Sequence, residues 1–195
     1  MIDFLSLEAP MKNCFQFKTM SILDHGLDVR EYFCELKEFI VNNKSLTKNW
    51  KFPSWISNEN IYKFFISYND EIARYYQIYH DCGKPFCIIF DENGNKHFPN
   101  HAKISAQKWK EHAQNFKYCD EIANLIEHDM DAHTIRSNEY FTFISQKNCI
   151  LLLLTALCEI HSNSNMFGDI DSDSFKIKFK KIDKLGKFVI NNLNL

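Results

Sequence analysis

Glycine and proline are scarce in this 195-residue chain, which contains five glycines and four prolines. Their scarcity, together with 15% aromatic residues, excludes collagen-like repetition and long disordered tracts. Long apolar runs are also missing. The most apolar run, residues 149–158, is about half of the ~20 residues needed to cross a bilayer, so no membrane segment and no membrane partner are expected. These absences predict one globular domain over residues 1–195.

An excess of basic charge is missing as well, because 23 Lys and Arg residues face 25 Asp and Glu residues and the formal net charge is −2. This balance excludes a basic field over the whole surface, so any contact with nucleic acid must be local. The seven cysteines form no C-x-x-C pair, which is typical of free thiols in a reducing compartment. The first eight residues carry acids where a secretory signal carries basic residues, so a cytoplasmic location is predicted.

Apolar residues recur at helical spacing along most of the chain and predict an all-α bundle. An amphipathic helix is expected over residues 21–42, and a second helix is expected to begin after a cap at Ser57. A third helix should end at the string His80 to Pro85, where Gly83 is expected to adopt the left-handed conformation. Further helices are predicted near residues 101–112, 118–129, 137–146 and 147–161.

Two local features complete the predicted fold, which has a core of about residues 21–165 and a C-terminal helix of about residues 172–192. The pair Asn93-Gly94, between short apolar segments, predicts one small β-hairpin between Phe86 and Phe98. Ser172 is positioned to cap the C-terminal helix. That helix is rich in lysine, and its polar face has two interpretations: a solvated surface, or a surface that lies along an RNA backbone. The lysines concerned are Lys176, Lys178, Lys180, Lys181, Lys184 and Lys187.

Histidines at or near the ends of predicted helices are the most informative residues. His25, His80, His101 and His128 each fall on a different predicted helix, and Asp81 and Asp129 directly follow two of them. Helices of a bundle can bring such side chains together, and buried imidazoles and carboxylates must be paired or bind metal. A single histidine more often has a structural role, so the set as a whole carries the prediction of a metal site.

One segment resembles a known family. The string His80-Asp81-Cys82-Gly83-Lys84-Pro85, followed by Asp91-Glu92-Asn93-Gly94, His97-Phe98 and His101, resembles the HD superfamily of metal-dependent phosphohydrolases. It looks especially like the HD domains of bacterial tRNA nucleotidyltransferases and of RNA end-healing enzymes that join an HD domain to a polynucleotide kinase. The resemblance extends from about residue 21 to residue 165 and implies an HD-domain helical bundle with the hairpin near the site.

The resemblance implies two divalent transition-metal ions, of manganese, iron, cobalt, nickel or zinc. His25, His80 and Asp81 would bind the first ion, and Asp81 would also bridge to the second ion. His101 and His128 would complete the shell of the second ion. Asp129 would bind metal directly or orient a neighbouring imidazole.

The same resemblance implies contacts with the substrate, and the sequence departs from the family pattern at one position. Lys84 would contact a phosphate oxygen. Many HD proteins supply a further aspartate from a late helix, whereas residues 154–162 contain none. Glu159, Asp129 or water could replace it, and His161 or Ser162 could instead contact the substrate phosphate.

The implied chemistry is attack on phosphorus by a hydroxide bound to the metal ions. Asp81 and Lys84 would act in catalysis, and His133 and His97 are the candidate proton donors to the leaving oxygen, because imidazole titrates in the useful range. His97 and His101 have the spacing of a helical zinc pair, but Pro99 between them argues against that interpretation.

The resemblance favours removal of 2′- or 3′-terminal phosphates, or opening of 2′,3′-cyclic phosphates, at RNA ends. Two alternatives remain open: a phosphatase of free nucleoside monophosphates, and a non-catalytic HD binding module. The chain has no G-x-x-x-x-G-K-[ST] loop, so a kinase or ligase partner would have to be a separate chain.

Overall fold

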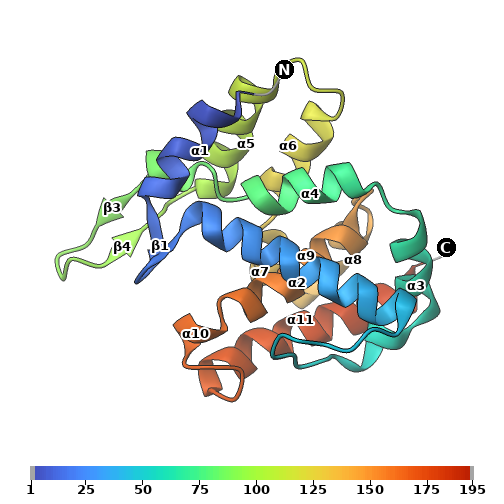
Figure 1. Cartoon of the computed structure of the whole chain (residues 1–195). Coiled ribbons are helices and arrows are strands. Elements are labelled where there is room, and N and C mark those ends of the chain that lie inside the picture. The colour runs from blue at the N-terminus through green and yellow to red at the C-terminus, as the bar shows by residue number, and fades with distance from the viewer. Residues whose placement is uncertain (1–2, 194–195) are drawn as a thin grey trace. The chain divides into compact units, whose positions relative to one another are not determined.

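The structure is a computed structural model that describes residues 3–193, and helices form most of it (Figure 1). The all-α prediction with a small hairpin is confirmed. The chain divides into two compact units: unit 1 comprises residues up to Leu27 together with Asp70–Asp129, and unit 2 comprises Asp28–Asn69 and the residues from Met130 onward. Within the described residues, no helix has both the length and the apolar character needed to span a membrane.

Unit 1 contains the whole HD-like string, the name used here for residues 80–85, 91–94, 97–98 and 101. Its core is built on α1, α4, α5 and α6, and α5 packs along α6. The Trp109 ring lies fully buried there, and its indole nitrogen donates a hydrogen bond to the Cys119 carbonyl at 3.1 Å. The elements are α1 (Phe4–Asn13), β1 (Phe15–Phe17), β2 (Met20–Ser21), the first turns of α2 (Ile22–Asn42), α4 (Asp70–Tyr79), the 3-10 helix η2 (Lys84–Phe86), β3 (Ile89–Phe90), β4 (Lys96–His97), α5 (His101–Ala113) and α6 (Cys119–Glu127).

Unit 2 is organised around α9, which is buried along almost its whole length, and α11 packs against it. Glu35 fixes the segment after α2, because its carboxylate accepts hydrogen bonds from the Thr47 backbone and hydroxyl and from the Trp50 indole. The elements are the rest of α2, the 3-10 helix η1 (Ser54–Ser57), α3 (Glu59–Ser67), α7 (Asp131–Thr134), the 3-10 helix η3 (Ser137–Glu139), α8 (Tyr140–Ile144), α9 (Cys149–Ser162), α10 (Ser164–Phe167) and α11 (Asp173–Asn192).

Residues 3–193 contain two short antiparallel hairpins besides the helices. The predicted hairpin is confirmed as β3 paired with β4, and Gly94 takes a φ of +77° in its turn. A second hairpin, β1 with β2, and the preceding helix α1 were not predicted. The β1 strand has three residues, too few to produce an alternating pattern that can be recognised in the sequence.

Two local predictions were wrong. Asn58, rather than Ser57, caps α3, because its side chain accepts a hydrogen bond from the Asn60 amide and Ser57 lies in η1. Gly83 is not left-handed; its φ is −83° and its ψ is −18°. A glycine is required there by close packing, since a Cβ atom would lie 2.3 Å from the Ser105 backbone nitrogen. The cap at Ser172 was predicted correctly: its hydroxyl accepts from the Phe175 amide at 3.2 Å.

Candidate metal centre

The candidate centre in unit 1 is built on the turn that follows α4. The helix ends at Tyr79, and the Cys82 and Lys84 amides donate hydrogen bonds to the carbonyls of Tyr79 and Asp81 at 3.0 Å. The Gly83 amide donates to the Ser105 hydroxyl on α5 at 2.8 Å. These bonds hold the turn rigidly between two helices, so the Asp81 side chain has a fixed position.

The start of α2 brings His25 to this turn. Ser21 precedes the first residue of the helix: its hydroxyl accepts a hydrogen bond from the Asp24 amide at 3.1 Å and donates to the Asp24 carboxylate at 2.7 Å. Gly26 then allows α2 to approach α4 closely, since a Cβ atom there would lie 2.1 Å from the Ile78 carbonyl oxygen. As a result the His25 ring lies edge-on to the His80 ring, with 5.2 Å between centroids.

Three imidazoles from three elements surround the Asp81 carboxylate. The Nε2 atoms of His80 and His25 lie 3.2 Å and 3.9 Å from Asp81 Oδ2, and that of His101 lies 3.5 Å from Oδ1. His25, His80 and Asp81 are buried, whereas the His101 side chain is 19% exposed. The centre therefore opens toward solvent on the side of α5.

Backbone carbonyls fix the tautomers of two of these rings. His80 Nδ1 lies 2.8 Å from the Gln77 carbonyl oxygen, and His101 Nδ1 lies 2.9 Å from that of Phe98. Because a carbonyl oxygen only accepts, Nδ1 carries the proton in both rings. In the neutral imidazole, Nε2 then presents its lone pair to the carboxylate. A proton or a metal cation between these electron-rich atoms would remove their repulsion.

Lys84 contacts the same carboxylate. Its Nζ lies 2.5 Å from Asp81 Oδ2 and donates to Gln16 Oε1 at 2.8 Å, and it also lies over the Phe98 ring at 5.4 Å. The Lys84 side chain is buried. Sequence reasoning missed Gln16, because a lone glutamine on a three-residue strand gives no recognisable signal.

The charge of Asp81 is set by opposing effects. Burial raises the pKa of its carboxyl, but the charge of Lys84 and the interactions with His80 and His101 outweigh burial and hold the pKa well below its usual range. The nearest positive charge is that of Lys84, whose Nζ lies 2.5 Å from Oδ2. Asp81 is therefore a buried anion whose compensation is ionic.

The donor set of three imidazoles and one carboxylate suits divalent transition metals. No protein-family model and no curated protein matches this chain.

Two predicted ligands lie at the end of α6. Asp129 is buried, and its Oδ1 accepts a hydrogen bond from the Tyr76 hydroxyl on α4 at 2.6 Å. His128 is the C-cap residue of α6 and is partly exposed. Tyr76 thereby links the end of α6 to the helix that leads into the Asp81 turn.

His97, a predicted proton donor, lies on the exposed hairpin. Its side chain is 54% exposed, and its Nε2 lies 2.9 Å from the Asp91 carboxylate. The hydrogen bonds from His97 and Asn95 lower the pKa of Asp91. In this position the His97 ring helps to hold the turn of the hairpin.

The other predicted site residues belong to unit 2. The Nε2 atom of His133 lies 2.8 Å from the Glu159 carboxylate, and Ser162 is buried at the end of α9. Both ring nitrogens of His161 are engaged: Nε2 accepts from the Lys51 amide at 3.0 Å, and Nδ1 donates to the Leu157 carbonyl at 2.7 Å. A phosphate contact by His161 would require one of these bonds to break.

Proposed function

We propose that unit 1 carries the catalytic centre of a metal-dependent phosphohydrolase of the HD type. The observation that supports this proposal is the buried Asp81 carboxylate, which three imidazoles face through Nε2 at 3.2–3.9 Å. An electron-rich, buried donor set of this kind is what divalent transition metals bind. His25, His80, Asp81 and His101 would hold the metal, with His128 and Asp129 as further candidates.

Divalent ions held here would activate water for attack on phosphorus and offset charge on the phosphoryl oxygens. The protein's own residues would do the rest. Asp81 keeps its negative charge, because the charges around it outweigh the effect of burial. The hydrogen bonds that Nδ1 donates to backbone carbonyls would already orient the rings of His80 and His101 before a metal ion binds.

Lys84 would bind a phosphoryl oxygen of the substrate. Its ammonium group is now shared between Asp81 and Gln16, and a phosphoryl oxygen would take part of that coordination. Gln16 would then keep the ammonium group near the carboxylate. This shared arrangement supports a role for Lys84 in the site over the alternative of a solvated lysine at a helix end.

The proposed reaction is release of 2′- or 3′-terminal phosphate, or opening of a 2′,3′-cyclic phosphate, at an RNA end. The HD-like string supports this substrate class. Any kinase or ligase that continues the repair would be a separate chain. The seven cysteines are free thiols, which supports the proposed cytoplasmic location.

The test is release of inorganic phosphate from a 3′-phosphorylated oligoribonucleotide with manganese, cobalt or nickel. The Asp81→Asn variant should be inactive. Asp120→Asn is the matched control, because it removes the same charge from a side chain that is 94% exposed. Inactivity of the unaltered protein on every such RNA end would overturn the proposed substrate.

Two other outcomes would redirect the assignment. Faster turnover of a nucleoside 3′-monophosphate than of a trinucleotide with the same end would favour a nucleotide phosphatase. A purified protein that contains no metal, and takes up none from a manganese or nickel solution, would favour a non-catalytic binding module.

A further inference from the structure

The C-terminal helix α11 concentrates positive charge in unit 2. Within its 20 residues it carries six lysines and two aspartates, whereas the whole chain has a formal net charge of −2. Most of the apolar residues of α11, among them Phe175, Ile182 and Val189, are buried. The lysines therefore lie on the outer side of a firmly packed helix.

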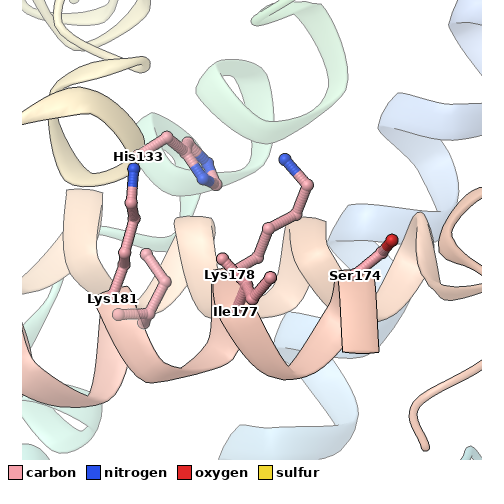
Figure 2. A pocket seen from close by; sticks show the side chains of 6 residues that line it. His133, Ser174, Ile177, Lys178 and Lys181 are labelled. Atoms are coloured by element: carbon pink, nitrogen blue, oxygen red, sulfur yellow. The ribbon is translucent and has the colours of Figure 1, made fainter. Parts of the chain in front are cut away.

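Two adjoining hollows run along this side of α11, where it lies beside α7 and η3. The first has a volume of about 290 Å³ and is lined by His133, Ser174, Ile177, Lys178, Lys181 and Ile182. In Figure 2 the His133 ring and the amino groups of Lys178 and Lys181 lie on the same side of the α11 ribbon. The second hollow has a volume of about 500 Å³, shares Ile177 and Lys181 with the first, and adds Lys180, Lys184 and Arg136. Together the two hollows form one groove, here called the cationic groove.

Within the described part of the chain, the lysines of the cationic groove form no ion pair with an acidic residue. Among residues 3–193, no carboxylate lies within 4.0 Å of the amino group of Lys180, Lys181 or Lys184. The amino group of Lys178 lies over the Phe167 ring, 4.9 Å from its centroid. In contrast, Lys187 on the same helix pairs with Asp183 at 2.7 Å. Lys178, Lys181 and Lys184 have no acidic residue three or four positions away along α11, so no charge of the helix itself offsets theirs.

We propose that the cationic groove binds the phosphate backbone of a single-stranded RNA. From Ser174 to Leu185 the groove extends roughly 16 Å along α11, at about 1.5 Å per residue, which is enough for a few nucleotides. Its lysines would pair with successive phosphates and release counterions. A membrane surface fits less well, because the apolar face of α11 is buried and Ile177 is the only exposed large apolar residue of α11 within the described chain.

This inference rests on the proposed function, because that function supplies RNA as the substrate class, but its test needs no hydrolysis. Fluorescence anisotropy would measure binding of a labelled oligoribonucleotide of about 12 nucleotides with a 3′-hydroxyl end, in the presence of a chelator. The full chain should bind it, and the affinity should fall steeply as salt is raised. RNA binding under these conditions would support the cationic groove even if the metal centre had no phosphatase activity.

The decisive variant replaces Lys178, Lys181 and Lys184 with glutamine. We expect its affinity to fall by about tenfold or more, and the slope of log K against log salt to become shallower by about 2, since each phosphate contact on a single strand contributes about 0.7. The matched control replaces Lys12, Lys63 and Lys110 with glutamine. These lysines are more than half exposed and each pairs with an acid, and the control lowers the net charge from −2 by the same three units.

Several results would overturn the proposal. They are absence of RNA binding by the unaltered protein, an equal loss of affinity in the two triple variants, or stronger binding to vesicles of anionic lipid or to a polyglutamate peptide than to the RNA. Circular dichroism should show the same helical content in both variants, because all six side chains are exposed. A Lys-to-Arg triple variant at positions 178, 181 and 184 should retain the affinity.

Discussion

Replacing Asp81 with asparagine keeps the shape of the side chain and removes one buried negative charge. Lys84 Nζ lies 2.5 Å from Asp81 Oδ2, and both side chains are buried. Loss of one partner from a buried ion pair costs about 3–5 kcal/mol, because the other charge is left uncompensated. Gln16 still accepts a hydrogen bond from Lys84. We therefore expect the free energy of unfolding to fall by about 3 kcal/mol, the lower end of that range, in the metal-free protein.

Urea unfolding in the presence of a chelator, followed by circular dichroism, measures this change. The double variant Asp81→Asn, Lys84→Met is the critical comparison. It removes both charges, and replacement of a buried ion pair by an apolar group is often close to neutral. We expect its stability to lie within about 1 kcal/mol of the unaltered protein. A single variant as stable as the double variant would show that Lys84 and Asp81 do not depend on each other.

The same single variant tests the chemistry. Without the carboxylate, the donor set keeps three imidazoles but loses its only anion, so retention of manganese or nickel should be lost. Phosphate release should fall by about a thousandfold or more, because metal activation of water supplies several kcal/mol. Helical content should stay nearly unchanged, since the role of Asp81 is ionic. Normal metal content together with normal turnover in Asp81→Asn would refute the assignment of the centre.

Three further predictions address packing, pH and positioning. Gly26→Ala should lower the free energy of unfolding in urea by about 2 kcal/mol or more and weaken metal retention, since the new Cβ would meet the Ile78 carbonyl. The control Gly94→Ala, which has open space around it but a φ of +77°, should lower the free energy of unfolding by only about 1 kcal/mol and leave metal retention intact. Equal effects of the two variants on metal retention would contradict this prediction. Burial lowers the pKa of His161 to about 4, so as the pH falls the unfolded chain binds a proton at this residue before the folded chain does. The free energy of unfolding should therefore drop by about 3 kcal/mol between pH 7 and pH 4, and this contribution should be absent in His161→Phe. An equal drop in both proteins would argue against a role for His161. Gln16→Ala removes a hydrogen-bond acceptor of Lys84 and should lower the free energy of unfolding by about 1 kcal/mol. It should also raise KM for the phosphorylated substrate more than it lowers kcat. An unchanged KM would exclude a role of Gln16 in positioning Lys84.

Features that depend on neighbouring residues could be predicted from the sequence. The apolar spacing predicted a helix over residues 21–42, and α2 spans Ile22–Asn42. Ser172 caps α11, and Asn93-Gly94 lies in the turn of the β3–β4 hairpin. Caps, turns and periodicity act over a few residues, so the sequence contains their signals directly.

Several contacts between residues far apart in the sequence could not be predicted. Gln16 meets Lys84 across 68 residues of sequence, and His161 accepts from the Lys51 amide across 110. Gly83 was expected to be left-handed from its place after a helix, yet its conformation is right-handed and its necessity comes from Ser105 on α5. Such contacts exist only once helices have packed, and no local pattern encodes them.

The His80-Asp81 pair illustrates why the candidate centre needs the residues that follow it. In an α-helix, consecutive side chains point about 100° apart, so neighbours cannot face one group. Here α4 ends at Tyr79, the Gly83 amide is fixed by the Ser105 hydroxyl, and Pro85 falls within η2. Because His80 and Asp81 lie beyond the end of α4, their side chains can face each other, and His80 Nε2 lies 3.2 Å from Asp81 Oδ2. The glycine that α5 packs against therefore belongs to the motif for a structural reason, and a substitution that extends α4 by one turn would separate the two donors.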